Sequence, residues 1–155
     1  MRDYTKIEAW RLADDLTVAV YERTRSFPKE ETYGLTSQLR RASYSVPANI
    51  VEGASRESNK DYLHFLYIER GSLSESQYFI RLAQRLDYLS SEEADALRQR
   101  TKVTFACLHG LISGSRERSR KIEQTGRDRQ QLDSDWAYAL VKWSVVRCLV
   151  VPFSG

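Results

Sequence analysis

Four segments of the chain repeat apolar residues at every third or fourth position, with short polar stretches between them. This spacing predicts helices over residues 5–26, 34–56, 58–89 and 91–116. Short connections make consecutive helices antiparallel neighbours, and each helix has an apolar stripe that it must bury against another helix. The sequence therefore predicts an all-α fold, an antiparallel up-down-up-down four-helix bundle that occupies residues 1–116.

Sequence signals for helix starts support these boundaries. A hydroxyl residue followed three positions later by an acidic residue is typical of a helix N-terminus, because the two side chains cap free backbone amides. Three such pairs occur: Thr5 with Glu8, Ser58 with Asp61 and Ser90 with Glu93. Pro47 lies inside the second predicted helix, and because proline has no amide hydrogen we expect a kink or a split there.

The composition excludes several classes of protein. With only 7 glycines and 3 prolines, the chain lacks the turns of a sandwich or barrel built from many short strands. Its 2 cysteines are too few for a disulfide scaffold and are typical of a reducing, cytoplasmic environment. No apolar run reaches the roughly 18 residues of a membrane-spanning helix, so we expect no membrane partner.

The C-terminal extension, residues 117–155, differs from the predicted bundle. Residues 1–115 contain 16 basic and 16 acidic side chains, whereas residues 116–155 contain 8 basic and 5 acidic ones, which places the whole net charge of +3 there. The extension begins as a polar linker and continues as an apolar segment over residues 136–155. The apolar segment is compatible with a buried strand, an interface helix or a disordered tail, and its pattern selects none of them.

The chain carries none of the common sequence signatures of an enzyme. A phosphate-binding loop, a dinucleotide-binding glycine motif and a nucleophile elbow are all absent from the sequence. No Glu-x-x-His pair is present, as the di-iron site of a helical bundle would need. His64 follows Asp61 by three residues without a second cluster, and Cys107 and His109 point to different sides of a helix. We therefore predict no enzymatic activity, no metal and no cofactor.

A polar strip borders the apolar stripe of the second predicted helix. It consists of Gln38, Arg41, Ser45, Asn49, Glu52 and Arg56. Because the strip borders the core, we expect it to be partly buried, with Arg41, Glu52 and Arg56 paired to one another. Arg40 points away from the strip, so we expect Arg41→Ala to destabilise the protein more than Arg40→Ala. The spacing favours a structural hydrogen-bond ladder, and the alternative is a ligand or nucleic-acid site.

A third strip on the same helix is apolar and lies on another side. It consists of Tyr44, Ala48 and Val51. In a small bundle, an additional apolar face of this kind usually packs against another subunit. We therefore predict a homo-oligomer with these three residues in its interface.

The segment FPKEETYGLTSQLRRASYSVPANIVEGASR resembles the hallmark of the bacterial 23S rRNA intervening-sequence proteins. The segments IEAWRLADDLTVAVYERTRSFP and YLHFLYIERGSLSESQY resemble the same family, and the resemblance extends over about residues 5–115. The positions that carry the family motif are Tyr33, Gly34, Leu35, Gln38, Arg40, Arg41, Asn49, Glu52, Gly53 and Arg56.

The resemblance implies a small cytosolic four-helix bundle, often assembled as a homopentamer, with no established enzymatic activity. The family is also similar to accessory proteins of diversity-generating retroelements, which bind nucleic acid and a reverse transcriptase. The implied partners are therefore other copies of the chain and RNA or a nucleic-acid-processing protein. The usual family member ends near the fourth helix, so the resemblance assigns no role to residues 116–155.

Together these observations predict a non-catalytic, RNA-associated oligomer. Arg40, Arg56 and Lys60, which we expect near one end of the second and third helices, are the candidates for weak contacts to the RNA backbone. The neutral charge of residues 1–115 argues against strong or broad binding. The alternative is a protein-interaction scaffold with no role in nucleic-acid binding.

Overall fold

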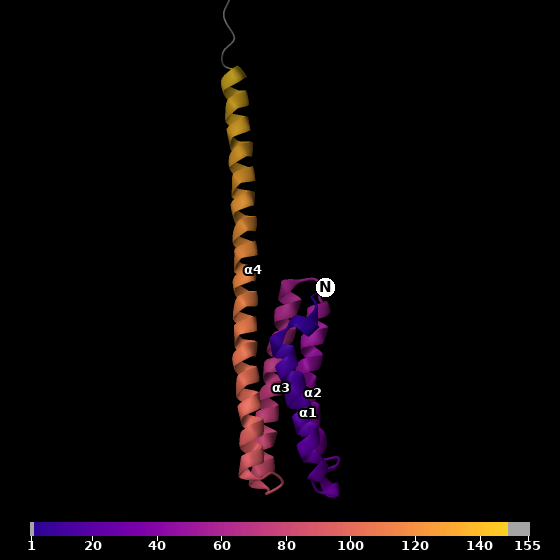
Figure 1. Cartoon of the computed structure of the whole chain (residues 1–155). Coiled ribbons are helices and arrows are strands. Elements are labelled where there is room, and N and C mark those ends of the chain that lie inside the picture. Colours follow the sequence, from indigo (N-terminus) through magenta and orange to yellow (C-terminus); the bar gives the residue numbers. More distant parts are fainter. Residues whose placement is uncertain (1, 149–155) are drawn as a thin grey trace, which may run out of the picture. The chain divides into compact units, whose positions relative to one another are not determined.

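The computed structural model describes the backbone of residues 2–148 and the side chains of residues 2–125 and 127–130. All regular structure in this part of the chain is helical (Figure 1). The helices are α1 (Glu8–Arg23), α2 (Leu35–Ser55), α3 (Asn59–Arg85) and α4 (Ser91–Cys148), with short 3-10 helices η1 (Tyr4–Lys6), η2 (Thr24–Ser26) and η3 (Lys29–Glu31). The chain divides into two compact units, Met1–Arg116 and Glu117–Gly155.

The first unit is a four-helix bundle, as the apolar spacing predicts. Helix α2 packs against both α1 and α3. Arg23 of α1 forms an ion pair with Glu93 of α4 at 3.0 Å, and Arg98 of α4 donates a hydrogen bond to Gln84 of α3. Each helix therefore contacts its neighbours in chain order, and α4 returns to α1 to close the bundle.

Apolar side chains from all four helices form one core. Its fully buried members include Leu16 and Val20 of α1, Leu39, Val46 and Ile50 of α2, Leu66, Leu73 and Ile80 of α3, and Leu97 and Leu108 of α4. Gly53 allows a close approach of α2 to α3, because a Cβ atom there would lie 2.9 Å from the Cβ atom of Phe65. Burial of these stripes supplies the main driving force for the fold.

Two of the three predicted capping pairs are confirmed. The Ser58 hydroxyl accepts a hydrogen bond from the backbone amide of Asp61 at 3.0 Å at the start of α3. The Ser90 hydroxyl accepts one from the amide of Glu93 at 3.2 Å, and the Glu93 carboxylate accepts one from the amide of Ser90 at 3.0 Å. This reciprocal pair is a complete capping box at the start of α4.

The third pair, Thr5 with Glu8, was predicted wrongly. The Thr5 hydroxyl donates to the carboxylate of Asp3 at 2.6 Å, and the Thr5 amide donates to the same oxygen at 3.1 Å. These bonds place Thr5 inside η1, so α1 begins at Glu8. The Glu8 carboxylate forms an ion pair with Arg11, which lowers the pKa of that carboxyl.

Helix α2 continues through Pro47 without a split. Pro47 has no amide hydrogen to donate to the Ser43 carbonyl four residues earlier. The Thr17 hydroxyl of α1 lies 3.0 Å from that carbonyl and 2.9 Å from the carbonyl of Ala13 in its own helix. The two carbonyls share the single hydroxyl hydrogen of Thr17, so a side chain of the neighbouring helix in part replaces the donor that Pro47 lacks, and the helix persists.

The fourth helix is longer than predicted. The sequence predicts its end near residue 116, whereas α4 runs from Ser91 to Cys148. The polar linker is tolerant of helix and contains no proline to end α4. Over residues 136–148 of the apolar segment, a helix therefore replaces the alternatives of a strand and a disordered tail. Residues 149–155 of the predicted apolar segment lie outside the described part of the chain.

Candidate functional site

The polar strip of α2 is more exposed than the sequence predicts. Gln38, Arg41, Glu52 and Arg56 are exposed, and only Ser45 and Asn49 are half-buried. Arg41 donates to the Gln38 side-chain carbonyl at 3.2 Å, and Glu52 pairs with Arg56, so the strip holds two local pairs instead of one buried cluster. The Glu52–Arg56 pair is as predicted, whereas the inclusion of Arg41 and the burial of the charged residues were predicted wrongly, because α1 and α3, which pack against α2, leave these side chains open to solvent.

Arg40 and Arg41 have the reverse of their predicted environments. Arg40 is half-buried, and its Nε donates to the hydroxyl of Thr24 at 2.7 Å. Its guanidinium also lies 4.8 Å from the ring centre of Tyr21. Helix α1 packs against this side of α2, so the residue that points away from the polar strip points towards a neighbouring helix.

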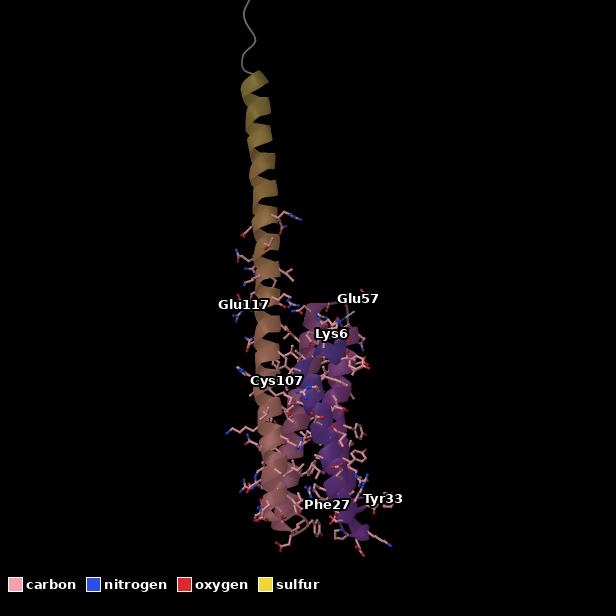
Figure 2. All side chains as sticks on the ribbon, in the orientation of Figure 1. Lys6, Phe27, Tyr33, Glu57, Cys107 and Glu117 are labelled. Carbon is pink, nitrogen blue, oxygen red and sulfur yellow. The ribbon has the colours of Figure 1, made fainter. Side chains whose placement is uncertain are left out.

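The three predicted RNA-contacting cations do not form one cluster. Arg40 lies in the half of α2 near Tyr33, whereas Arg56 and Lys60 lie at the connection to α3, about 24 Å along the helix. Figure 2 shows Tyr33 at one end of the bundle and Glu57 at the other. Arg56 and Lys60 are both exposed, and they remain neighbours.

The family motif at the start of α2 is a capping device. The Glu31 carboxylate accepts a hydrogen bond from the amide of Leu35 at 2.7 Å, and Tyr88 donates to its other oxygen at 3.4 Å. A Cβ atom at Gly34 would lie 2.4 Å from the capping oxygen of Glu31. Gly34 thus leaves room for the cap, while the side chain of Tyr33 is 92% exposed. The capping role of Glu31 was missed from the sequence.

The predicted interface strip is accessible on the bundle. Tyr44 and Ala48 are exposed and Val51 is half-buried. Tyr44 exposes 46% of its surface. A role of this strip in self-association stays a prediction.

A basic stripe on α3 was missed by the sequence analysis. Along this helix, Arg70, Ser74, Tyr78, Arg81 and Arg85 recur at spacings of three or four residues, which places them on one face. All five are exposed. The same periodicity that reveals the apolar stripes also places these residues on one face of the helix, so the stripe has a signal in the sequence.

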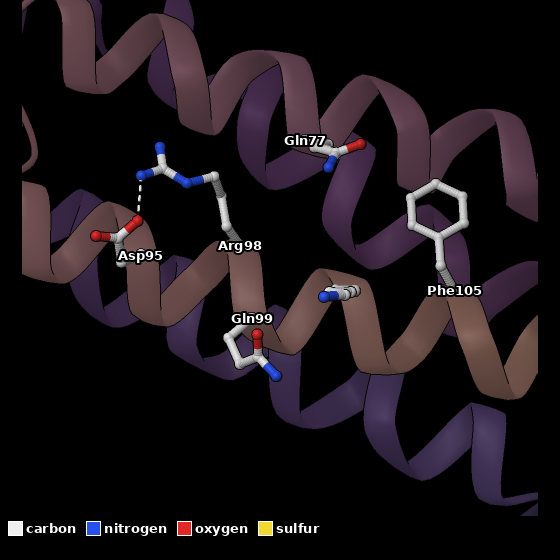
Figure 3. Close-up of a pocket in the computed structure, with 6 residues that line it drawn as sticks. Gln77, Asp95, Arg98, Gln99 and Phe105 are labelled. Atoms are coloured by element: carbon white, nitrogen blue, oxygen red, sulfur yellow. Dashed lines mark hydrogen bonds and ion pairs between the residues drawn. The ribbon is translucent and has the colours of Figure 1, made fainter.

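Two adjoining pockets lie beside this stripe, between α3 and α4. One, of about 550 Å³, is lined by Gln77, Asp95, Arg98, Gln99, Lys102 and Phe105 (Figure 3). The other, of about 440 Å³, is lined by Ser74, Gln77, Tyr78, Arg81 and Arg98. Because Gln77 and Arg98 line both, we treat the two pockets as one surface feature, the α3–α4 groove. Both are open depressions in the surface of the bundle.

The cations of the groove differ in how they are engaged. Arg98 forms an ion pair with Asp95, drawn as a dashed line in Figure 3, and donates a hydrogen bond to the side chain of Gln84. Within the described part of the chain, Arg81 and Lys102 make no ion pair. The guanidinium of Arg81 and the ammonium group of Lys102 are therefore available to an anionic ligand.

Three cations on α1 and at the end of α2 provide a contrast. Arg11, Arg23 and Arg56 are each paired with a carboxylate of the chain. On the α3 stripe, Arg70 lies 5.2 Å from the ring centre of Tyr67 and has no carboxylate partner among the described residues. The α3–α4 side thus carries three cations, Arg70, Arg81 and Lys102, that make no ion pair within the described part of the chain.

Glu69 is the one fully buried carboxyl group among the described residues. It lies in α3 on the core side, and neither of its carboxyl oxygens has a hydrogen-bond partner. Burial raises the pKa of Glu69 to about 9, so this side chain is protonated and uncharged at neutral pH. Glu69 therefore contributes no charge to the groove on the surface.

The described residues contain no group of three or more His, Cys, Asp and Glu side chains placed to hold a metal ion. None of the helices, as far as they are described, combines the length and apolar character needed to cross a membrane. The groove is thus a polar and basic surface with aromatic side chains at its rim. Its chemistry is suited to binding anions.

Comparison with known proteins identifies the family. The family model for the 23S rRNA-intervening sequence protein matches residues 5–110. The chain belongs to this family. The matched residues include the capping motif at the start of α2 and every residue that lines the α3–α4 groove.

One solved structure shows that the fold occurs elsewhere in related proteins. It is a protein of unknown function from the S23 ribosomal protein family of Bacteroides thetaiotaomicron. The structures superimpose with a TM-score of 0.62 at 19% identity, over 67% of this chain and 97% of that chain. No curated protein sequence matches the chain. The likeness to the solved structure supports the fold of this family member.

Proposed function

We propose that this member of the 23S rRNA-intervening sequence protein family is a non-catalytic, cytoplasmic RNA-binding protein. In this proposal, the α3–α4 groove contacts the phosphate backbone of RNA. The observation that carries it is the pair of unengaged cations, Arg81 and Lys102, in an exposed groove with no carboxylate partner in the described chain.

The charge distribution sets the expected strength of binding. Cations that bind phosphates release the counterions condensed on the nucleic acid, and this release makes the affinity depend on salt. The body of the protein, residues 1–115, has equal numbers of acidic and basic side chains, so long-range attraction is small. We therefore expect weak binding that is lost as the salt concentration rises, with little preference for sequence.

The proposal contains no catalytic step. The chemistry of the Cys107 thiol supports this feature of the proposal. Burial, together with the nearby carboxylate of Glu8, raises the pKa of the Cys107 thiol. A thiol with a raised pKa is a poor nucleophile, because the thiolate is the reactive form. The predicted cations at the α2–α3 connection, Arg56 and Lys60, supply at most a second and smaller contact, since Arg56 is already paired with Glu52.

A titration of fluorescently labelled RNA tests the proposal. We expect the unmodified protein to bind a structured ribosomal RNA fragment at low salt, and Arg81→Ala/Lys102→Ala to weaken binding by about tenfold, or about 1.4 kcal/mol. The matched control is Lys6→Ala/Arg11→Ala, which removes the same charge from two exposed residues that form ion pairs within the chain. Equal weakening by both variants would show that net charge alone, not the groove, determines binding.

The alternative function is that of a protein-interaction scaffold. The exposed apolar strip of Tyr44, Ala48 and Val51 favours it, because such a strip gains stability by packing against another protein. Absence of RNA binding at low salt would favour this scaffold function. In both proposals the protein is a homo-oligomer that uses this strip.

A further inference from the structure

Tyr78 is an exposed aromatic residue in the middle of a basic surface. It exposes 60% of its surface, although it lies on a helix whose other aromatic side chains largely pack inwards. Its ring centre lies 5.4 Å from that of Phe79, and the two planes are tilted by 58°. Phe79 is half-buried against the core, so it supports one side of the Tyr78 ring while the rest of that ring faces solvent.

The neighbours of Tyr78 place positive charge close to its ring. Arg81 lies one turn further along α3, and Arg98 of α4 lines the same pocket. Side chains three residues apart on a helix lie side by side, with Cβ atoms about 5–6 Å apart. An RNA base stacked on Tyr78 would therefore have its phosphate within reach of the Arg81 guanidinium.

Tyr67 offers a useful comparison on the same helix. Its ring is already covered on one face by the guanidinium of Arg70, at 5.2 Å from the ring centre. No cation is placed over Tyr78 in the described part of the chain. Of the two aromatic residues, Tyr78 has the ring that is free to receive a base.

We infer that Tyr78 is a stacking platform for an unpaired RNA base, with Arg81 and Lys102 at the flanking phosphates. This inference rests on the proposed function and adds the class of RNA. Duplex RNA keeps its bases stacked on one another and offers only backbone and groove edges, whereas a single strand offers base faces to aromatic side chains. The combination of an open tyrosine ring with unengaged cations thus selects single-stranded RNA over a duplex.

The test compares single-stranded and duplex probes on the full chain. The probes are a labelled oligouridylate and oligoadenylate of about 12 nucleotides and a blunt RNA duplex of the same length, all at low salt. We expect Tyr78→Ala to weaken single-strand binding by about five- to 150-fold, the range for loss of one stacked base, and to leave duplex binding unchanged. Tyr78→Phe keeps the ring and should retain the single-strand affinity.

Matched variants separate the inference from the function on which it rests. Tyr33→Ala removes a tyrosine that is 92% exposed and lies outside the groove, so it should leave both affinities unchanged. Suppose that Arg81→Ala/Lys102→Ala weakens binding of the single-stranded and the duplex probes, while Tyr78→Ala weakens neither kind. The groove then binds RNA and the stacking role is refuted. If Tyr78→Ala weakens the binding of single-stranded and duplex probes equally, selection of unpaired bases is refuted. If no probe binds the unmodified protein, both the function and the inference fail.

Discussion

The Thr17 hydroxyl of α1 lies 3.0 Å from the Ser43 carbonyl of α2, the acceptor that Pro47 leaves without an amide donor. This contact joins two helices at the point where proline would otherwise weaken one of them. Pro47 and Ser43 are both buried, which limits the access of solvent to the unpaired carbonyl. The contact explains how a proline is accommodated in a continuous 21-residue helix.

Replacing Thr17 by valine tests this contact. Thr17→Val keeps the shape of the side chain and removes the donor, so the Ser43 carbonyl loses its partner at a cost of about 1–3 kcal/mol in unfolding free energy. Pro47→Ala restores a backbone amide, and in that background Thr17→Val should cost less. Urea denaturation of the two single variants and the double variant measures the coupling. Equal effects of Thr17→Val in both backgrounds would disprove the role of Pro47.

Glu69 should make the stability of the protein fall as the pH rises. Its pKa is about 9 in the folded chain against an ordinary value of 4.5, so between these values the folded protein holds a proton that the unfolded chain has released. Its stabilising contribution is therefore fully present below pH 4.5, and it declines by about 1.4 kcal/mol per pH unit until the folded pKa is reached.

A neutral variant provides the measurement for Glu69. Glu69→Gln cannot ionise, so its unfolding free energy should decline less steeply than that of the unmodified protein between pH 5 and pH 8. Glu75→Gln, at an exposed position of the same helix, is the matched control and should retain the original slope. Parallel pH profiles for the protein and Glu69→Gln would show that Glu69 is not the group responsible.

The structure reverses the expected effects of the two adjacent arginines of α2. Arg40→Ala removes a hydrogen bond to Thr24 and a cation–π contact with Tyr21, so it should lower the unfolding free energy by about 1–3 kcal/mol. Arg41→Ala removes an exposed hydrogen bond to Gln38 and should cost less than about 0.5 kcal/mol. Thermal unfolding followed by circular dichroism compares them, and a larger effect of Arg41→Ala would contradict the structure.

These arginines also show where sequence reasoning succeeds and where it ends. The apolar spacing of α2 places Leu39, Val46 and Ile50 correctly in the core, because period and burial are properties of a single helix. The environment of Arg40 depends on which side of α2 is covered by α1, and one helical wheel carries no such information. The side of α2 that faces α1 had to come from the structure.

The α3–α4 groove was missed for the same physical reason. Tyr78 and Lys102 lie on different helices, and packing of α3 against α4 brings their pockets together. Thr5 was assigned to a cap because its spacing to Glu8 fits the pattern, whereas its amide and its hydroxyl both donate to the carboxylate of Asp3. Local patterns identify donors and acceptors well, and competition between partners decides which bonds form.

Self-association tests the exposed apolar strip of α2. Light scattering should give a mass near 90 kDa, which is five times the 18.0 kDa of the chain. Tyr44→Glu places a charge in the proposed interface and should lower this mass. Tyr33→Glu is the control, because Tyr33 is more exposed and lies outside the strip. A mass of 18.0 kDa for the unmodified protein at micromolar concentration would refute self-association, and a dimer or tetramer would refute only the pentamer.

The salt dependence of RNA affinity is the most direct test of the central claim that the α3–α4 groove binds phosphates. The logarithm of the association constant should fall linearly with the logarithm of the salt concentration for the unmodified protein. Arg81→Ala/Lys102→Ala, which removes two phosphate contacts, should reduce the slope by about 1.4–1.8, while Lys6→Ala/Arg11→Ala leaves it unchanged. An unchanged slope for Arg81→Ala/Lys102→Ala would contradict the assignment of RNA binding to this groove.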